Sequence, residues 1–227
     1  TAIGLRDYAV DPARMSVVAP GTDGADLAIG TLENEPERGL RLLCVASLTT
    51  RKGHDTLFAS LETLRDHRWE LVCAGSAQHD PQHARALRGQ IDTLGMGSLV
   101  SLVGELDDEG LRHAYSRADV FVLASHHEGY GMVFDEALAR GLPIVSTTAG
   151  AIPDTVPPAA GLLVEPGDAL ALAGALRRVM VDSRVRQRLR EGAIEARETL
   201  RSWTLVGEEF DAVLRIVCSQ SAEGSSR

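Results

Sequence analysis

Short apolar segments alternate with longer amphipathic ones along most of this 227-residue chain. Six of them are rich in Val and Leu at consecutive positions, which is typical of strands buried on both faces of a parallel sheet. These predicted strands are Leu40–Leu48, Trp69–Ser76, Leu99–Leu106, Asp119–Ser125, Pro143–Thr148 and Gly161–Glu165. The stretch after the first of them, His54–Arg65, has its apolar residues on one helical face. Such alternation predicts a doubly wound α/β sheet, in which ligands bind beyond the carboxyl ends of the strands.

Helices are predicted between the later strands and throughout the C-terminal region. Amphipathic spacing places them at Ala84–Leu94, Asp108–Ala118, Gly131–Arg140, Ala169–Val181, Ser183–Thr199 and Trp203–Cys218. Residues 1–30 form a linker-like entry segment with one short strand at Met15–Ala19. Residues 31–200 form the α/β domain, and residues 201–218 form a C-terminal helix with an apolar stripe. Residues 219–227 are predicted to be a disordered polar tail.

The composition fits a folded protein and excludes several functions. A net charge of −9 argues against a nucleic-acid-binding surface. The cysteines Cys44, Cys73 and Cys218 are odd in number and scattered, so no disulfide or zinc site is expected, and Cys44 and Cys73 lie in apolar segments, which predicts buried thiols. No segment is apolar over a membrane-spanning length, so we expect a cytoplasmic protein with no transmembrane segment. The first residue is Thr1 rather than Met, which indicates a piece of a longer protein.

The most informative segment is the turn after the fourth predicted strand. It contains Gly129-Tyr130-Gly131, with Glu128 before it and Glu136 in the helix that follows. Backbone N–H groups at a strand-to-helix turn bind phosphates, and carboxylates suit sugar hydroxyls, so the turn is compatible with a nucleotide-sugar site. The spacing of the carboxylates carries no weight, since Glu62 and Glu70 repeat it. From the residues alone, a purely structural turn is an equally good interpretation.

A basic loop follows the first predicted strand and ends at the same edge of the sheet. It begins at Ser47 and contains the adjacent cations Arg51 and Lys52, which can neutralise a diphosphate. A solvent-exposed role is the slightly better interpretation for Arg51, and a functional one for Lys52. The loop is neither a P-loop nor a dinucleotide fingerprint. Gly75 and Gly104 end two further strands, and each by itself is better explained as a strand-end turn than as part of a nucleotide pocket.

Together these motifs resemble the retaining glycosyltransferases of family 4 (group 1), which have the GT-B fold. The run from Glu128 to Glu136 matches that family's Glu-x7-Glu signature, including the Gly-aromatic-Gly and the Gly141-Leu142-Pro143 that follows. The Lys52-Gly53 loop and the turns at Thr148–Asp154 and Gly161–Asp168 are similar as well. The resemblance covers about residues 10–215. It implies the C-terminal, donor-binding half of such an enzyme, with a Rossmann-like, mostly parallel six-stranded sheet and helices on both faces.

The resemblance also implies roles for the site residues. Glu136 would bind the ribose of a UDP- or GDP-sugar, Glu128 the transferred sugar, and Lys52 the departing diphosphate. The remaining nucleotide contacts would come from Gly129, Tyr130, Gly131, Met132, Val133, Arg51, Ser47, Gly75 and Gly104. No metal and no cofactor are implied, because cations and a helix N-terminus do a metal's work. The reaction would be front-face transfer of the sugar to an acceptor hydroxyl, with retention and without an assigned nucleophile.

The chain departs from the family pattern in two motifs and in extent. The usual Gly-Arg-Leu after the first strand reads Ala46-Ser47-Leu48, so Arg51 would replace one phosphate contact, and the usual Gly-Asp-Gly-Pro reads Gly75-Ser76-Ala77-Gln78. An N-terminal acceptor-binding domain would precede Thr1, and any membrane contact would be made through it. In the family the helix that corresponds to Trp203–Cys218 crosses to that domain, so part of its apolar stripe here would be either refolded onto the α/β domain or left as an exposed apolar patch. A non-catalytic nucleotide-sugar-binding module, a glycosyl phosphorylase and an epimerase remain as alternatives.

Overall fold

The computed structural model describes residues 11, 15–30 and 39–224, with side chains through residue 218. These residues fall into two compact units. The larger is Ala25–Thr199, and the smaller joins the segment that ends at Gly24 to the segment that begins at Leu200. The predicted tail beyond Gly224 and the first part of the entry segment lie outside the described residues. Within these ranges, no helix combines the length and the apolar character needed to cross a bilayer.

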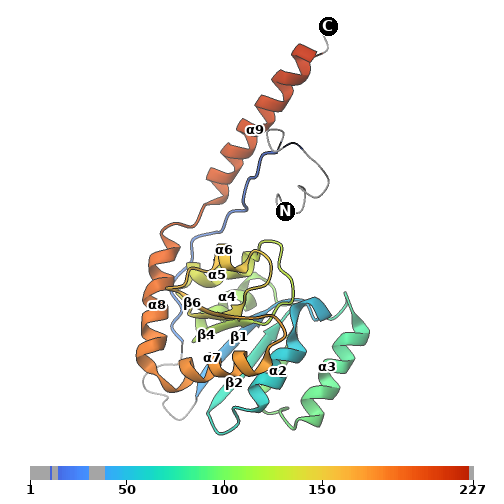
Figure 1. Ribbon diagram of the computed structural model, residues 1–227, viewed down its shortest axis with the longest axis vertical. Helices are drawn as coiled ribbons and strands as arrows, with labels where there is room; N and C mark the ends of the chain where they lie inside the picture. The colour runs from blue at the N-terminus through green and yellow to red at the C-terminus, as the bar shows by residue number, and fades with distance from the viewer. Residues whose placement is uncertain (1–10, 12–14, 31–38, 225–227) are drawn as a thin grey trace. The chain divides into compact units, whose positions relative to one another are not determined.

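A six-stranded sheet forms the centre of the larger unit (Figure 1). Its strands are β1 (Leu40–Val45), β2 (Trp69–Ala74), β3 (Val100–Gly104), β4 (Val120–Leu123), β5 (Ile144–Thr147) and β6 (Gly161–Val164). They follow the order β3-β2-β1-β4-β5-β6, and every pairing is parallel. The central strands β4 and β5 are buried at every position, because helices cover both of their faces. The doubly wound, Rossmann-like sheet is therefore confirmed.

Helices cover both sides of the sheet, with α2, α3 and α7 along one side and α4 and α5 along the other (Figure 1). Right-handed crossovers require this, because the chain moves outward from β1 in one direction first and then in the other. The helices of this unit are η2 (Thr50–Lys52), α2 (His54–Glu62), α3 (Pro81–Thr93), α4 (Asp108–Arg117), α5 (Met132–Ala139), α6 (Ile152–Thr155), α7 (Ala169–Val181) and α8 (Ser183–Arg197). Asp168 caps α7 as its position in the sequence predicts, accepting a hydrogen bond from Ala171 N at 2.8 Å.

Some local predictions were wrong. Met15–Ala19 forms no strand, and Ser16–Pro20 instead lies beside α9 (Trp203–Gly224) in the smaller unit. The short helices η2 and α6 were missed, because three or four residues are too few to show helical periodicity. The helix α9 continues beyond Cys218, where its end was predicted, since residues 219–223 contain no Pro or Gly to stop it.

The smaller unit leaves much of the apolar stripe of α9 in solvent. Its entry segment is tied to the start of the helix by a hydrogen bond from Thr22 N to Arg201 O at 2.8 Å. Val206 is buried, but several large apolar side chains are 45–57% exposed: Trp203, Leu205, Phe210, Leu214, Ile216 and Val217. Of the two outcomes predicted for this stripe, refolding onto the α/β domain or an exposed apolar patch, these exposed fractions correspond to the second.

Candidate functional site

The order of the strands reverses between β1 and β4. From β1 the chain moves to β2 and β3 on one side, and it then returns to β4 on the other side. In doubly wound sheets, ligands bind beyond the carboxyl ends of the strands at such a reversal point. The loop after β1 carries η2, and the loop after β4 carries the Gly129–Gly131 turn. The two loops are joined by a backbone hydrogen bond from His126 N to Arg51 O at 2.8 Å.

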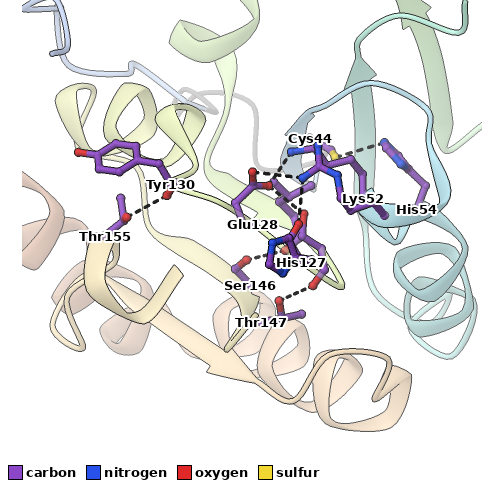
Figure 2. A network of polar contacts seen from close by, with 12 residues as sticks. Cys44, Lys52, His54, His127, Glu128, Tyr130, Ser146, Thr147 and Thr155 are labelled. Atoms are coloured by element: carbon purple, nitrogen blue, oxygen red, sulfur yellow. Dashed lines mark hydrogen bonds and ion pairs between the residues drawn. The ribbon is translucent and has the colours of Figure 1, made fainter. Parts of the chain in front are cut away.

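An ion pair between Lys52 and Glu128 lies at this point (Figure 2). Lys52 Nζ is 2.5 Å from Glu128 Oε2, and the two side chains are only 11% and 9% exposed. Arg51, which is half-exposed, places Nη1 at 3.5 Å from Glu128 Oε1. Ser125 Oγ donates to the same carboxylate at 3.3 Å. A carboxylate this deeply buried needs such partners, because an unpaired charge in the interior is costly.

The position of Lys52 depends on the glycine that follows it. Gly53 has φ 64 and ends η2 while beginning α2. A Cβ atom at Gly53 would lie 2.0 Å from Ala124 O. Only glycine therefore lets this loop lie directly against the end of β4, where it brings Lys52 to Glu128 across 76 residues of sequence.

The turn after β4 presents the N-terminus of α5. Gly131 is the N-cap, with φ 87, and none of the described side chains caps the helix. The first backbone N–H groups of a helix have no intrahelical acceptor, so those of Met132 and Val133 are available to an anion. A Cβ at Gly131 would come within 2.5 Å of the Phe134 ring, whereas one at Gly129 would meet no described atom within 4 Å. The fold thus requires glycine at Gly131 but does not explain Gly129.

Glu136, one helical turn further on, is held by a buried tyrosine that the sequence reasoning missed. Tyr115 of α4 donates from its hydroxyl group to Glu136 Oε2 at 2.8 Å. Burial and the Glu136 carboxylate raise the pKa of Tyr115 well above its ordinary value, so the phenol keeps its proton and remains a donor. Arg140 lies 4.4 Å above the Tyr115 ring and donates to the Glu136 carbonyl at 2.8 Å. Nothing in the sequence spacing connects Tyr115 to Glu136, because the fold alone brings the side chain of Tyr115 in α4 to Glu136 in α5.

The other predicted residues also lie at the carboxyl edge of the sheet. Ser47, Gly75 and Gly104 stand at the ends of β1, β2 and β3, and Gly75 N donates to Gly104 O at 2.7 Å. By contrast, Glu62 ends α2, and Glu70 lies near the start of β2, where it accepts from Arg41 Nε at 2.7 Å. The pair that repeats the spacing of Glu128 and Glu136 is therefore at the opposite edge of the sheet, and of these two pairs only that of Glu128 and Glu136 lies at the carboxyl edge, where the strand order reverses.

Comparisons with known proteins agree with this architecture. The model of the family described as glycosyl transferases group 1 matches residues 32–196. D-inositol 3-phosphate glycosyltransferase of Thermobifida fusca is 30% identical over 210 residues, covering 86% of this chain and 48% of that protein. Sucrose-phosphate synthase from Thermosynechococcus elongatus superimposes with a TM-score of 0.81 at 28% identity, covering 96% of this chain and 56% of that one.

A more distant structure shows the same fold, and this chain again covers only part of its length. The Anabaena protein HepE, solved in complex with UDP-glucose, has a TM-score of 0.81 at 18% identity, over 94% of this chain and 61% of its own. This chain spans about half the length of the curated relatives it matches. The matched region contains the sheet, the Lys52–Glu128 ion pair and the N-terminus of α5. The chain belongs to the glycosyl transferases group 1, and its fold is that of GT-B glycosyltransferase structures.

Proposed function

We propose that this chain is the donor-binding half of a retaining glycosyltransferase. The enzyme transfers a sugar from a nucleoside-diphosphate sugar, UDP- or GDP-linked, to an acceptor hydroxyl. The observation that supports this most directly is the buried Lys52–Glu128 ion pair beside the uncapped N-terminus of α5, at the reversal point of the sheet. One cation, one carboxylate and a set of backbone donors are the groups needed for a diphosphate attached to a sugar.

The diphosphate is bound by backbone N–H groups and by cations. Met132 N and Val133 N offer hydrogen bonds together with the positive end of the helix dipole. Lys52 adds a full charge, and Arg51 adds a second one at the exposed rim. Lys52 is the single lysine among the 23 Lys and Arg residues of the sequence. A lysine is a compact charge on a flexible stem, which suits a phosphate whose charge grows and moves as its bond to the sugar breaks.

The two glutamates of the signature bind hydroxyl groups on either side of the diphosphate. Glu136 has one oxygen fixed by Tyr115, which leaves the other to accept from the ribose. Glu128 contacts the transferred sugar. Because the Lys52 ammonium has three donors, it can hold Glu128 and a phosphate oxygen at the same time. Gly129 leaves room for the donor above the turn, and Ser47, Gly75 and Gly104 border the nucleotide.

The transfer needs no metal at the diphosphate, because Lys52, Arg51 and the helix N-terminus supply the positive charge there. The bond between the sugar C1 and the phosphate oxygen breaks, and the phosphate keeps the electron pair. The acceptor oxygen attacks C1 from the same face, and its proton passes to the departing phosphate. In this scheme Glu128 forms no covalent intermediate.

The acceptor-binding half is the other partner of the site. We propose that it is supplied by the part of the relatives' length that this chain does not span, that the protein is cytoplasmic, and that any membrane contact is made through that half. This chain alone then binds the donor but transfers little or no sugar. A phosphorylase would instead require inorganic phosphate, an epimerase would alter the nucleotide sugar without acceptor, and a non-catalytic module would bind donor but remain inactive when both halves are present.

Calorimetric titration with UDP, GDP, ADP and their sugar conjugates tests the donor assignment. We expect one nucleotide to bind, and we expect Glu136→Ala to weaken that binding by roughly 10- to 100-fold, as for loss of hydrogen bonds to a charged group. Glu62→Ala is the matched control and keeps wild-type affinity, since Glu62 lies at the opposite edge of the sheet. Equal binding by all three proteins would contradict the ribose assignment.

Tyr115→Phe tests whether the phenol orients Glu136. The ring fills the same space, and only the 2.8 Å hydrogen bond to Glu136 Oε2 is lost. We expect about a fivefold loss of nucleotide affinity, corresponding to about 1 kcal/mol for one hydrogen bond. The loss should vanish when the ribose hydroxyls are removed from the ligand. An equal effect on the 2′,3′-dideoxy nucleotide would assign Tyr115 a purely structural role.

A further inference from the structure

Three side chains with metal-binding atoms converge in the core beside the Lys52 loop. Cys44 and Cys73 are register partners on the neighbouring parallel strands β1 and β2, so their side chains lie on the same face of the sheet. His54 is the first residue of α2, which covers that face. The two sulfur atoms and one imidazole nitrogen all lie within 4.8 Å of one another. All three residues are at most 1% exposed.

The separation of the best-defined pair fits two ligands on one ion. Cys44 Sγ lies 3.6 Å from His54 Nε2, and Figure 2 shows the two side chains pointing toward each other. Zinc binds sulfur at about 2.3 Å and nitrogen at about 2.0–2.1 Å, and at a tetrahedral angle these bonds place the two ligand atoms about 3.6 Å apart. An ion could therefore bind these two atoms without separating the strand from the helix, and Cys73 would approach from the third side.

The imidazole of His54 and the net charge of the three ligands with an ion also favour a metal site. His54 Nδ1 is buried and has no hydrogen-bond partner among the described residues, so its only polar contact of hydrogen-bonding length there is the sulfur of Cys44. Buried polar atoms without a hydrogen-bond partner are uncommon and call for an explanation. Two thiolates and a neutral imidazole have zero net charge around Zn²⁺, and one thiolate, one thiol and a neutral imidazole have zero net charge around Cu⁺. A buried position tolerates such neutral arrangements best.

We propose that Cys44, His54 and Cys73 form a structural site for a thiophilic cation, Zn²⁺ or Cu⁺. Sulfur and imidazole ligands select these ions over Mg²⁺ or Ca²⁺, which prefer oxygen. The ligands at positions 44 and 54 bracket residues 45–53, the loop that carries Arg51 and Lys52. A bound ion would thus hold both ends of this loop against β2. The ion lies in the core and takes no part in the transfer, which remains metal-independent at the diphosphate.

Metal content and a spectroscopic probe test this site without reference to nucleotide binding. The chain is unfolded with reductant and chelator and then refolded anaerobically with Zn²⁺, with Cu⁺ or without metal. We expect one equivalent of one of these ions to remain after dialysis and to raise the unfolding temperature. We also expect Co²⁺, used as a stand-in, to give the charge-transfer absorption of thiolate ligands. The arm that retains metal identifies the ion.

Cys218 supplies the matched control, because it is a free and exposed thiol far along the sequence. Cys218→Ser should keep the metal and the cobalt spectrum, whereas Cys44→Ser and Cys73→Ser should lose at least 100-fold in metal affinity. If the serine variants do not fold, the wild-type comparison with and without metal still decides. A wild-type protein that refolds fully, binds neither ion and shows three free thiols would overturn the proposal in favour of a simple S–H···N hydrogen bond.

Discussion

Replacing Lys52 with Ala should lower the rate of sugar transfer by roughly 10²- to 10³-fold, the usual cost of removing one group that stabilises developing charge. Of the two cations that pair with Glu128, Lys52 is the buried one, with its side chain 11% exposed, and Arg51 is half-exposed and 3.5 Å from the carboxylate. Without Lys52, the departing diphosphate would have only the backbone donors and a solvent-screened guanidinium. The measurement is the turnover of the chain joined to its acceptor-binding half, at saturating donor.

Two further variants separate chemistry from folding. Arg51→Ala should cost less than about tenfold, because exposed charges contribute little. Lys52→Arg keeps the positive charge but replaces the compact ammonium with a planar guanidinium. Relative to Lys52→Ala, it should recover more of the folding stability than of the turnover. Circular dichroism at the assay temperature must show that each variant is folded, since Glu128 loses its main partner in Lys52→Ala. If folded Lys52→Ala turns over at the wild-type rate, Lys52 has no part in the transfer.

The single lysine of the sequence also permits a chemical test. An amine-specific acylating reagent can modify only Lys52 and the chain terminus. Bound nucleoside diphosphate should protect Lys52 from modification, and the corresponding nucleoside without phosphate should not. This result would connect Lys52 to the phosphates independently of any mutant. Equal modification with and without the diphosphate would contradict the contact.

Gly131→Ala should lower the free energy of unfolding by roughly 2–4 kcal/mol, combining the cost of a non-glycine residue at positive φ with that of overpacking. Gly131 has φ 87, and an added Cβ would lie 2.5 Å and 2.8 Å from two atoms of the Phe134 ring. The ring cannot easily move, because it is fully buried and packs edge-on against Phe121 at 5.7 Å. Chemical denaturation of the chain measures the difference.

Gly129→Ala is the matched comparison, two residues away in the same turn. A Cβ there would meet no described atom within 4 Å, so the unfolding free energy should change by less than about 0.5 kcal/mol, as at an ordinary surface site. If the donor lies over this turn, the same substitution should nevertheless weaken nucleotide-sugar binding. Equal stability losses at both positions would show that the turn is not held as described. Unchanged donor binding in Gly129→Ala would remove the glycine from the site.

The sequence was most informative where an apolar or amphipathic pattern continued over a whole strand or helix. The six strands and the helix Ala169–Val181 were predicted with nearly the observed bounds, because burial on both faces and amphipathic spacing leave direct patterns in the residues. The same reasoning failed at Met15–Ala19, where apolar residues pack beside α9 and not in a sheet. It also missed α6, which is a single helical turn. Short segments take their conformation from whatever they contact, and the sequence does not state those contacts.

For the site, too, the sequence predicted local properties but not which residues would meet. Sequence motifs placed Lys52, Glu128 and Glu136 at loops and helix starts beyond the strands, because residue type and position relative to a strand are local properties. That Lys52 and Glu128 form a buried ion pair follows from the strand order, which places β1 beside β4. A parallel sheet can join its strands in several orders, and the choice among them depends on packing over the whole domain.

By itself, the sequence determined the alternation of strands and helices, the strand-to-helix turn between Glu128 and Glu136, and the family resemblance. Only the tertiary structure decided that Tyr115 holds Glu136 and that Cys44, Cys73 and His54 meet in the core. Their separations along the chain match no motif, because each contact arises from strand register, from a helix packing on the sheet or from a contact between two helices. Such contacts are set by side-chain volume and burial across the whole sheet, and no short stretch of sequence contains that information.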